Sequence, residues 1–486
     1  MKVPVPLAFC LALQTAAISA TEQIVTLGDS LTFAYEAEFC FSKNITGYGT
    51  IGDGFGPSVR NWIEILNNPT YRGDKFELGT RNSITVDPPA PLDPSFDLYF
   101  RQSHNWAIPG LKVDGLRRFL TGEASFRDLL DDDPGFSTID LIFDYSDYTD
   151  AEFALGDLQT QIQGTAERMT IFVGGNDIKE VYGTIYNGGS AGTFVADFMA
   201  DMVAVLDIVQ TLNPQLQIVL VNVPHIGITP QIRGLYPYDA VKTERVSAVL
   251  RDLNSQLASL AASRNLGYAD IYTPILSLYV SAQYPLCIYG FNFSNSGTVV
   301  DNVGPVWLNG PISANFHPNT NAQSVIANEI ILAFNKRYNT GIAPLSATEI
   351  LGSLLGKGAG EIDMSFTTWM NRYFVPSTPP ASPSADDSDG DGIPAAVEFA
   401  LGLSPKRHDS DRVSSGIAAG ALELAYPIRV PGSTRFTLTP ESSTDLTSGF
   451  TPLVPPPAPG PDGLSRARLA LGSGPGFLRL KSTLPP

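Results

Sequence analysis

The chain contains few basic residues, few histidines and very little cysteine. Among its 486 residues, 31 are Lys or Arg and 49 are Asp or Glu, which gives a formal net charge of −18. Nucleic-acid binding depends on neutralising phosphates with basic side chains, so this composition argues against a nucleic-acid partner. With 43% hydrophobic residues the chain can still bury a sizeable core. The composition therefore predicts a folded, acidic protein.

Long hydrophobic runs are also scarce, and the main one lies at the N-terminus. It covers residues 3–17, follows the charged Lys2, and ends in small residues up to Ala20. This pattern is typical of a secretory signal peptide over residues 1–20, and it predicts a protein that is secreted or held at the cell surface. A membrane anchor is the alternative, which Gln14 and Thr15 and the short length disfavour.

Cysteine gives only a weak indication of the compartment. Of the three cysteines, Cys10 lies inside the predicted signal peptide, so Cys40 and Cys287 remain. In an oxidising compartment they could form a single disulfide, or both could be buried thiols. The sequence leaves both alternatives open because it does not give the distance between them.

Short apolar runs alternate with segments of helical periodicity through the first two thirds of the chain. This order predicts an α/β domain over residues 21–340, a three-layer α/β/α arrangement with a parallel sheet, similar to flavodoxin-like folds. Residues 341–385 are predicted to be a helical and Pro/Ser-rich linker, and residues 386–486 a small β-rich module. The expected strands are 23–27, 139–143, 169–173, 217–223 and 266–272, and the main expected helices are 194–211, 241–263 and 322–336.

A serine stands where the first predicted strand ends, in the segment Gly28-Asp29-Ser30-Leu31. Ligands of parallel sheets bind beyond the carboxyl ends of the strands, so a hydroxyl on this turn is well placed for chemistry. Serine needs a base to become a nucleophile, and acyl transfer needs donors for the developing oxyanion. Alternatively, Asp29 or Ser30 only caps the next helix.

Three later segments, 105–110, 173–177 and 316–319, follow this motif in order. Together the four segments resemble the blocks of the GDSL/SGNH hydrolase family. The resemblance implies Ser30 as nucleophile and His317 as base, with Gly110 and Asn176 as oxyanion donors. It also implies an ester substrate, either a lipid, an acylated polysaccharide or a small ester, and no cofactor for the chemistry.

The last segment departs from the family pattern in one respect. The family has an aspartate three residues before the histidine, and here that position is Ala314. In serine proteases, loss of this carboxylate costs about ten thousand fold in turnover, so the sequence predicts a Ser-His dyad or an incomplete triad. Asp301 and Asn315 are the nearest polar alternatives for orienting the ring. The alternative function is a weakened fold that serves as an extracellular glycan-binding, lipid-binding or adhesion protein.

Other candidate residues are weaker. His225 follows a predicted strand, and we interpret it as structural or substrate-lining, while His104 adjoins the second segment and could line the pocket. Ser190, in the segment 188–192, fits the G-x-S-x-G pattern of α/β-hydrolases. That motif needs a strand directly before it, and the residues preceding Ser190 resemble a loop.

An acidic segment after the linker has the spacing of a calcium-binding loop. The carboxylates at loop positions one, three, five and twelve are Asp387, Asp389, Asp391 and Glu398, and Ile393 at position seven would ligate through its carbonyl oxygen. The segment resembles the calcium repeats of secreted bacterial proteins, which implies structural Ca²⁺ and a module that stiffens the protein or contacts a cell surface or glycan. Alternatively, the acidic residues only cap the helix that follows.

Overall fold

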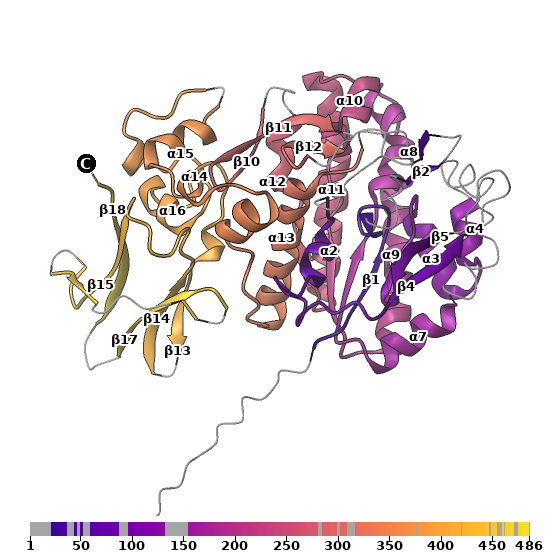
Figure 1. Ribbon diagram of the computed structural model, residues 1–486, viewed down its shortest axis with the longest axis horizontal. Coiled ribbons are helices and arrows are strands. Elements are labelled where there is room, and N and C mark those ends of the chain that lie inside the picture. Colours follow the sequence, from indigo (N-terminus) through magenta and orange to yellow (C-terminus); the bar gives the residue numbers. More distant parts are fainter. Residues whose placement is uncertain are drawn as a thin grey trace, which may run out of the picture.

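The computed structural model of the chain has a parallel sheet between two layers of helices, followed by smaller antiparallel sheets (Figure 1). This architecture confirms the predicted three-layer α/β/α class. The signal segment 1–20 and Cys40 lie outside the described residues, so their predictions stay open. The structure describes residues 21–35, 43–45, 49–51, 59–86, 96–131, 154–279, 284–298, 302–308, 316–375, 377–418, 420–446, 449–453, 459–460, 462–470 and 475–485.

The central sheet has the strand order β6-β1-β7-β8-β9, and each neighbouring pair is parallel. Side chains of β1 and β7 are buried along their whole length, as expected for strands that are covered on both faces. The strands are β6 (Asn105–Ala107), β1 (Ile24–Gly28), β7 (Arg168–Phe172), β8 (Gln217–Val221) and β9 (Gly267–Ala269).

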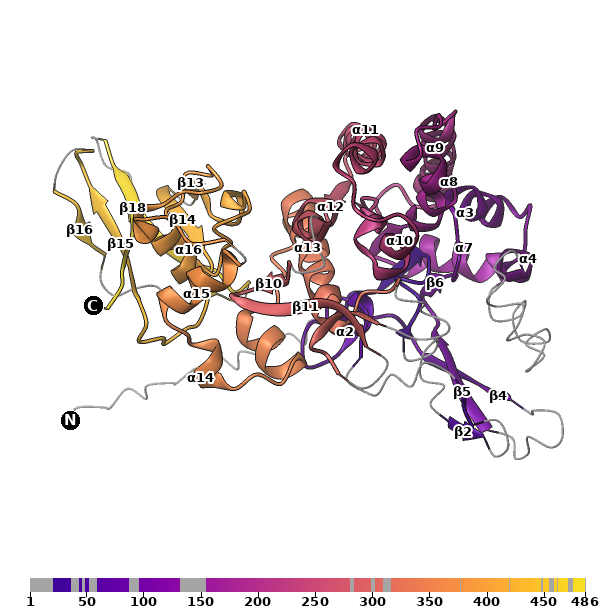
Figure 2. The same cartoon turned by 90° about the horizontal axis from the view of Figure 1, so that it is seen from above.

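Alternate side chains of these strands enter two separate cores. Val25 and Leu27 pack on one face against α3, α7, α8, α9 and α11, whereas Ile24 packs on the other face with α2 and α13. Figure 2 shows the two helical layers on either side of the sheet. These helices are α3 (Val113–Thr121), α7 (Leu155–Gly164), α8 (Gly175–Tyr186), α9 (Phe194–Leu212), α11 (Ala240–Ser263), α2 (Trp62–Asn67) and α13 (Thr320–Tyr338).

The observed elements match most of the predicted ones. The helices predicted at 194–211, 241–263 and 322–336 correspond to α9, α11 and α13. The predicted strand 266–272 is too long, because Asp270 accepts hydrogen bonds from the backbone N–H groups of Tyr272 and Thr273 and starts a helix there. The predicted strand 139–143 lies outside the described residues.

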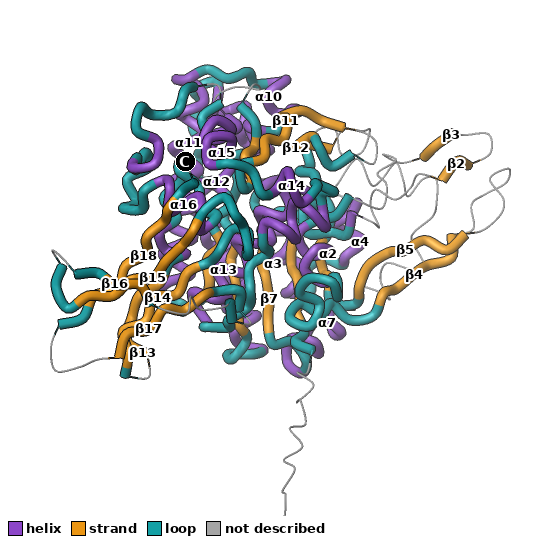
Figure 3. The backbone as a smooth tube through the Cα atoms, turned by 60° about the vertical axis from the view of Figure 1, so that its left-hand side comes forward, coloured by secondary structure: helices purple, strands orange, loops and turns teal. Residues whose placement is uncertain are grey.

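Further short elements surround the three layers. Two hairpins, β2 with β3 and β4 with β5, extend away from the central sheet (Figure 3). The strands outside the central sheet and the C-terminal part are β2 (Lys43–Ile45), β3 (Gly49–Ile51), β4 (Arg81–Val86), β5 (Phe96–Gln102), β10 (Leu286–Ile288), β11 (Phe291–Thr298) and β12 (Pro305–Leu308). The short helices are α4 (Phe126–Asp131), η1 (Ile226–Ile228), α10 (Pro230–Leu235), α12 (Tyr272–Ile275) and η2 (Leu276–Tyr279).

The C-terminal part forms two antiparallel three-stranded sheets, which agrees with the predicted β-rich module. They consist of β13 (Ser414–Ala418), β14 (Ala421–Tyr426) and β17 (Ser465–Ala470), and of β16 (Thr451–Pro452), β15 (Thr437–Ser443) and β18 (Phe477–Thr483). Between the two parts lie η3 (Thr348–Leu354), α14 (Ala359–Ile362), α15 (Phe366–Tyr373), η4 (Pro383–Ala385), α16 (Ala395–Leu401) and η5 (Ser410–Arg412).

The segment that joins the two parts is firmly packed. Trp369 on α15 is fully buried, and its ring contacts Phe399 of α16. Both rings belong to the same core cluster as Ile330 and Phe334 of α13. The helices of the predicted linker therefore attach the C-terminal part to the sheet domain. In the described part of the chain, no helix combines the length and hydropathy that a bilayer crossing requires.

Candidate active site

Ser30 and His317 meet at the carboxyl edge of the central sheet. Ser30 follows β1, and His317 lies just before α13. The Ser30 Oγ and the His317 Nε2 are 2.8 Å apart, although 287 residues separate them in sequence. Both residues are buried, with exposed fractions of 7% and 6%. The structure thus brings the predicted nucleophile and the predicted base into hydrogen-bonding contact.

The turn that carries Ser30 depends on glycine and on local hydrogen bonds. A Cβ atom on Gly28 would lie 2.6 Å from the Thr32 side chain, so only glycine fits where the strand meets the turn. The Asp29 carbonyl accepts from the N–H of Thr32, at 2.9 Å, and from that of Phe33, at 3.0 Å. These bonds fold the chain back directly after the serine.

The backbone around His317 is fixed on both sides. The His317 carbonyl accepts from the N–H of Leu308 on β12 at 2.9 Å, and the N–H of Asn319 donates to the Val306 carbonyl at 2.7 Å. The Asn319 side chain then caps α13 by accepting from the Thr320 N–H at 2.7 Å. His317 therefore lies between a strand and a capped helix, which limits its movement.

Tyr35, five positions after Ser30, contacts His317 and Pro318. Its hydroxyl donates to the Pro318 carbonyl at 3.0 Å and accepts from the Gln323 amide at 2.6 Å. Its ring stands edge-on to the His317 ring, with centroids 6.1 Å apart and an interplanar angle of 88°. Nothing in the sequence indicates Tyr35 or Gln323, because no spacing rule connects positions so far apart in the chain.

The two predicted oxyanion donors lie on neighbouring turns. Gly110 follows β6 with a φ of +77°, a left-handed conformation that favours glycine. Asn176 lies in the first turn of α8, and its side-chain amide donates to the Leu111 carbonyl at 3.2 Å. A primary amide carries two N–H bonds, so one remains for a ligand. Within the described ranges, no protein acceptor binds the backbone N–H of Ser30 or of Gly110.

Two buried carboxyl groups lie beneath the site. Asp29 accepts from the Leu31 N–H at 2.9 Å, and Asp177 accepts from the Val113 N–H at 3.1 Å. Burial, with the negative charge of Asp177, raises the pKa of Asp29 to about 7. Burial, with the charge of Asp114, likewise raises the pKa of Asp177 to about 7. Both carboxyl groups are therefore partly protonated near neutral pH.

The remaining sequence candidates lie elsewhere. His225 is fully buried, and its ring bonds the Ser247 hydroxyl at 3.1 Å and the Gly227 N–H at 3.2 Å, so it has a structural position. His104 precedes β6 at the end away from Ser30. Ser190 lies between α8 and α9 rather than after a strand, so the α/β-hydrolase alternative is wrong. Ala314, Asn315 and Asp301 lie outside the described residues.

A comparison of the sequence with known protein families agrees with the geometry of the site. Residues 24–330 match the model of the GDSL-like Lipase/Acylhydrolase family, a span that contains both Ser30 and His317. The chain belongs to this family. It is therefore a hydrolase that acts on ester bonds, and lipids and other esters are the substrates that the family indicates.

Several solved structures resemble this GDSL-like acylhydrolase at low identity. An extracellular lipase from Streptomyces rimosus is 13% identical, with a TM-score of 0.32, and the alignment covers 65% of this chain and 99% of that one. Phospholipase A1 from Streptomyces albidoflavus is also 13% identical, with a TM-score of 0.32 and coverages of 65% and 100%. A lipase from the goat rumen metagenome is 13% identical, with a TM-score of 0.34 and coverages of 64% and 97%. No curated protein sequence is significantly similar to the chain.

The predicted calcium loop of this acylhydrolase lies far from Ser30 in the sequence, between η4 and α16. Asp387, Asp389 and Asp391 lie close together, with one carboxylate oxygen of each within 4.8 Å of the others. Glu398 is a fully buried residue of α16. Ile393 follows Gly392, and its N–H donates to the Asp391 carboxylate at 2.8 Å. The structure holds all five predicted residues within one loop and the helix that follows it.

Proposed function

We propose that this GDSL-like acylhydrolase is a secreted serine esterase in which Ser30 is the nucleophile and His317 is its base. The observation that supports it most directly is the 2.8 Å contact between Ser30 Oγ and His317 Nε2. This separation is within the range that proton transfer between a hydroxyl and a general base requires. The apolar N-terminal segment 1–20 supports secretion.

The reaction proceeds through an acyl-enzyme. Ser30 Oγ attacks the ester carbonyl carbon while His317 Nε2 takes the hydroxyl proton. The tetrahedral intermediate collapses, the bond to the alcohol oxygen breaks, and the alcohol leaves with the proton from His317. Water then attacks the acyl-serine with His317 again as base, which releases the acid and restores the Ser30 hydroxyl. No cofactor takes part in either half.

Three N–H donors would stabilise the oxyanion. They are the backbone N–H groups of Ser30 and Gly110 and the second N–H of the Asn176 amide. The first N–H of that amide donates to the Leu111 carbonyl at 3.2 Å, and this bond orients the Asn176 side chain before the substrate binds. Donors that are already oriented need little reorganisation during the reaction, so they stabilise the negatively charged transition state effectively.

The orientation of His317 comes from more than one neighbour. The Tyr35 ring is edge-on to the imidazole, and Phe316 lies against it with an interplanar angle of 82°. Ala314 occupies the family's aspartate position, so the imidazolium lacks that carboxylate's stabilisation and turnover is expected to be modest. This substitution also supports the second candidate function, a weakened fold that binds glycans or lipids.

An active-site phosphonate probe separates the two functions. The wild-type protein should be labelled at Ser30, and Ser30→Ala should abolish both labelling and hydrolysis of short-chain aryl esters. His317→Ala should lower the labelling rate by at least about a hundredfold, since the base would be absent. Ser190→Ala is the matched control and should keep full labelling. An unlabelled but folded wild-type protein would support the binding function instead.

A further inference from the structure

Two groups of carboxylates share Asp391 near the start of α16. The first group is Asp387, Asp389 and Asp391, and the second is Asp391, Glu398 and Asp409. Within each group, one carboxylate oxygen of every residue lies within 4.8 Å of the others. Asp409 is an additional member, because it lies outside the loop 387–398 that has the spacing of a calcium-binding site. The two groups together form a continuous set of oxygen donors.

Glu398 distinguishes this set from an ordinary acidic surface. The residue is 0% exposed, and neither of its carboxylate oxygens has a hydrogen-bond partner in the described part of the chain. A buried carboxylate without a donor is unfavourable, so this position needs a positive partner.

Asp409 is also buried and only partly satisfied. It is 3% exposed, its Oδ2 accepts from the Ser404 N–H at 3.2 Å, and its Oδ1 has no partner among the described residues. The Asp409 N–H donates to the Asp391 Oδ2 at 3.2 Å, which keeps the two side chains together. Glu398 and Asp409 thus both carry an unpaired oxygen, and each places a carboxylate oxygen within 4.8 Å of one from Asp391.

We propose that these five carboxylates bind one calcium ion, with Asp409 as a ligand from outside the loop, and that the ion fixes the C-terminal part to α13. Ca²⁺ takes six to eight oxygen ligands in a flexible geometry, which suits several carboxylates and a backbone carbonyl such as that of Ile393. Mg²⁺ fits less well, because it prefers a smaller octahedral shell and keeps most of its waters.

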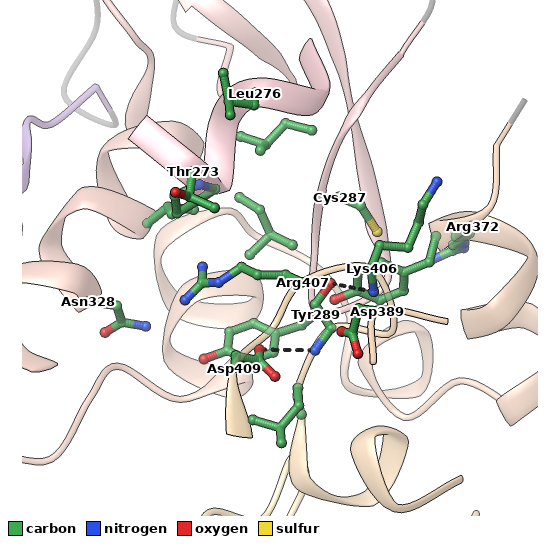
Figure 4. Close-up of a pocket in the computed structure, with 18 of the residues that line it drawn as sticks. Thr273, Leu276, Cys287, Tyr289, Asn328, Arg372, Asp389, Lys406, Arg407 and Asp409 are labelled. Atoms are coloured by element: carbon green, nitrogen blue, oxygen red, sulfur yellow. Dashed lines mark hydrogen bonds between the residues drawn. The ribbon is translucent and has the colours of Figure 1, made fainter. Parts of the chain in front are cut away.

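The connection to α13 runs through two arginines beside Asp409. Arg407 and Arg412 each form an ion pair with Glu329 of α13, at 3.0 Å and 2.9 Å. Glu329 is largely buried, so these pairs are poorly screened by solvent. Arg407, Asp409 and Asp389 line a cavity of about 520 Å³ between the two parts of the protein (Figure 4). An ion held by Asp409 would therefore order the segment that contacts α13.

Calcium titration of the full-length protein tests the ligand set. After chelation and dialysis, isothermal titration calorimetry should show one Ca²⁺ per chain. Asp409→Asn should weaken binding by at least about tenfold, the low end of what even an outer partner of a metal site costs. Asp411→Asn is the matched control, since its exposed carboxylate pairs with Lys336. It should change the affinity by no more than about twofold because its charge is screened by solvent.

Three results would overturn this ligand set: no binding to the wild type, two ions per chain, or equal affinity of Asp409→Asn and the wild type. Asp389→Asn serves as the second variant in case Asp409→Asn does not fold. It should weaken binding to a similar degree, and wild-type affinity in this variant would count equally against the site.

Hydrogen exchange tests the link to α13. Adding Ca²⁺ to the chelated protein should slow exchange in residues 404–412 and in the α13 segment around Glu329. In Glu329→Gln, calcium should still bind and protect residues 387–398, but the added protection of α13 should be lost. Protection confined to residues 387–398 in the wild type would contradict the link, because the ion would then order only its own loop.

Discussion

The Tyr35 hydroxyl donates to the Pro318 carbonyl at 3.0 Å, while its ring packs against the His317 ring at nearly a right angle. A side chain five positions after Ser30 thus contacts Pro318, the residue that follows His317. Tyr35 is 1% exposed, so these contacts are made away from solvent. The two ends of the site are therefore connected by a side chain as well as by the Ser30–His317 hydrogen bond.

Replacing Tyr35 by phenylalanine tests whether its hydroxyl positions His317 for catalysis or only stabilises the fold. Tyr35→Phe keeps the ring but loses the hydroxyl contacts, so we expect kcat to fall by about tenfold with little change in KM. Stability should fall by about 1 kcal/mol. Tyr338→Phe is the control, because its hydroxyl bonds the Ile218 backbone far from the site. It should lose stability but keep kcat in the same aryl ester assay, and an equal loss of kcat in both variants would contradict the positioning role.

Asn176→Ala should reduce the rate without reducing substrate affinity. Loss of one oxyanion donor typically lowers kcat by about a hundredfold to a thousandfold, since the bond is strongest in the transition state. Asn187→Ala removes an amide that bonds the Gly183 carbonyl at the end of α8, at 2.9 Å, and should leave kcat unchanged. Steady-state kinetics on both variants measure the difference. A rise in KM with constant kcat would instead place Asn176 in ground-state binding.

His225 should make the protein sensitive to mild acid. Burial lowers the pKa of His225 from 6.5 to about 4, so between these values the unfolded chain binds a proton that the folded chain does not. Stability is therefore fully present above pH 6.5 and is lost as the pH falls toward 4, by up to about 3 kcal/mol. His225→Gln should flatten this part of the profile in urea unfolding measured from pH 4 to 7. An unchanged slope would contradict the buried neutral imidazole.

Asp177 should have the opposite effect on the pH profile. Its pKa is raised from 3.8 to about 7, so between these values the folded chain holds a proton that the unfolded chain has lost. Its contribution to stability is therefore lost as the pH rises from about 4 to 7, by up to about 4 kcal/mol. Asp177→Asn should remove the part of this loss that Asp177 causes and also ease the ionisation of Asp29, whose own burial causes a similar loss. The same unfolding series measures it, and a loss of undiminished size in the variant would exclude Asp177 as one of its sources.

Much of the fold could be predicted from the sequence because most of its helices and strands have a clear hydrophobic pattern of their own. The helices α9, α11 and α13 have strong helical periodicity, and the strands β1, β7 and β8 are buried apolar runs. The short strand β6 (Asn105–Ala107) was missed, because three residues give too little pattern to distinguish a strand from a loop. Its place at the edge of the sheet, beside β1, depends on tertiary pairing.

The site was predictable where a short motif carries the chemistry. Ser30, Gly110, Asn176 and His317 each lie in a recognisable segment, and the Ser30–His317 contact agrees with their assigned pairing. Tyr35, Gln323 and Asp409 gave no such signal, because their importance depends on distances between remote parts of the chain. Asn61 is an intermediate case: its side-chain amide donates to the Thr32 and Phe33 carbonyls of the turn after Ser30, at 3.1 Å and 2.7 Å. The capping box that it forms with Glu64, three positions later, is a pattern that the sequence could have indicated.

The helix α13 begins just after His317 and ends beyond the ion pairs that join it to the C-terminal part. A ribosome must therefore make more than half of the protein between the serine and the histidine. A copy that is interrupted before His317 retains the Ser30 hydroxyl and the amide donors, but it lacks both the imidazole and the helix α13, against which the C-terminal part packs. Fragments of this kind are expected to be inert toward esters.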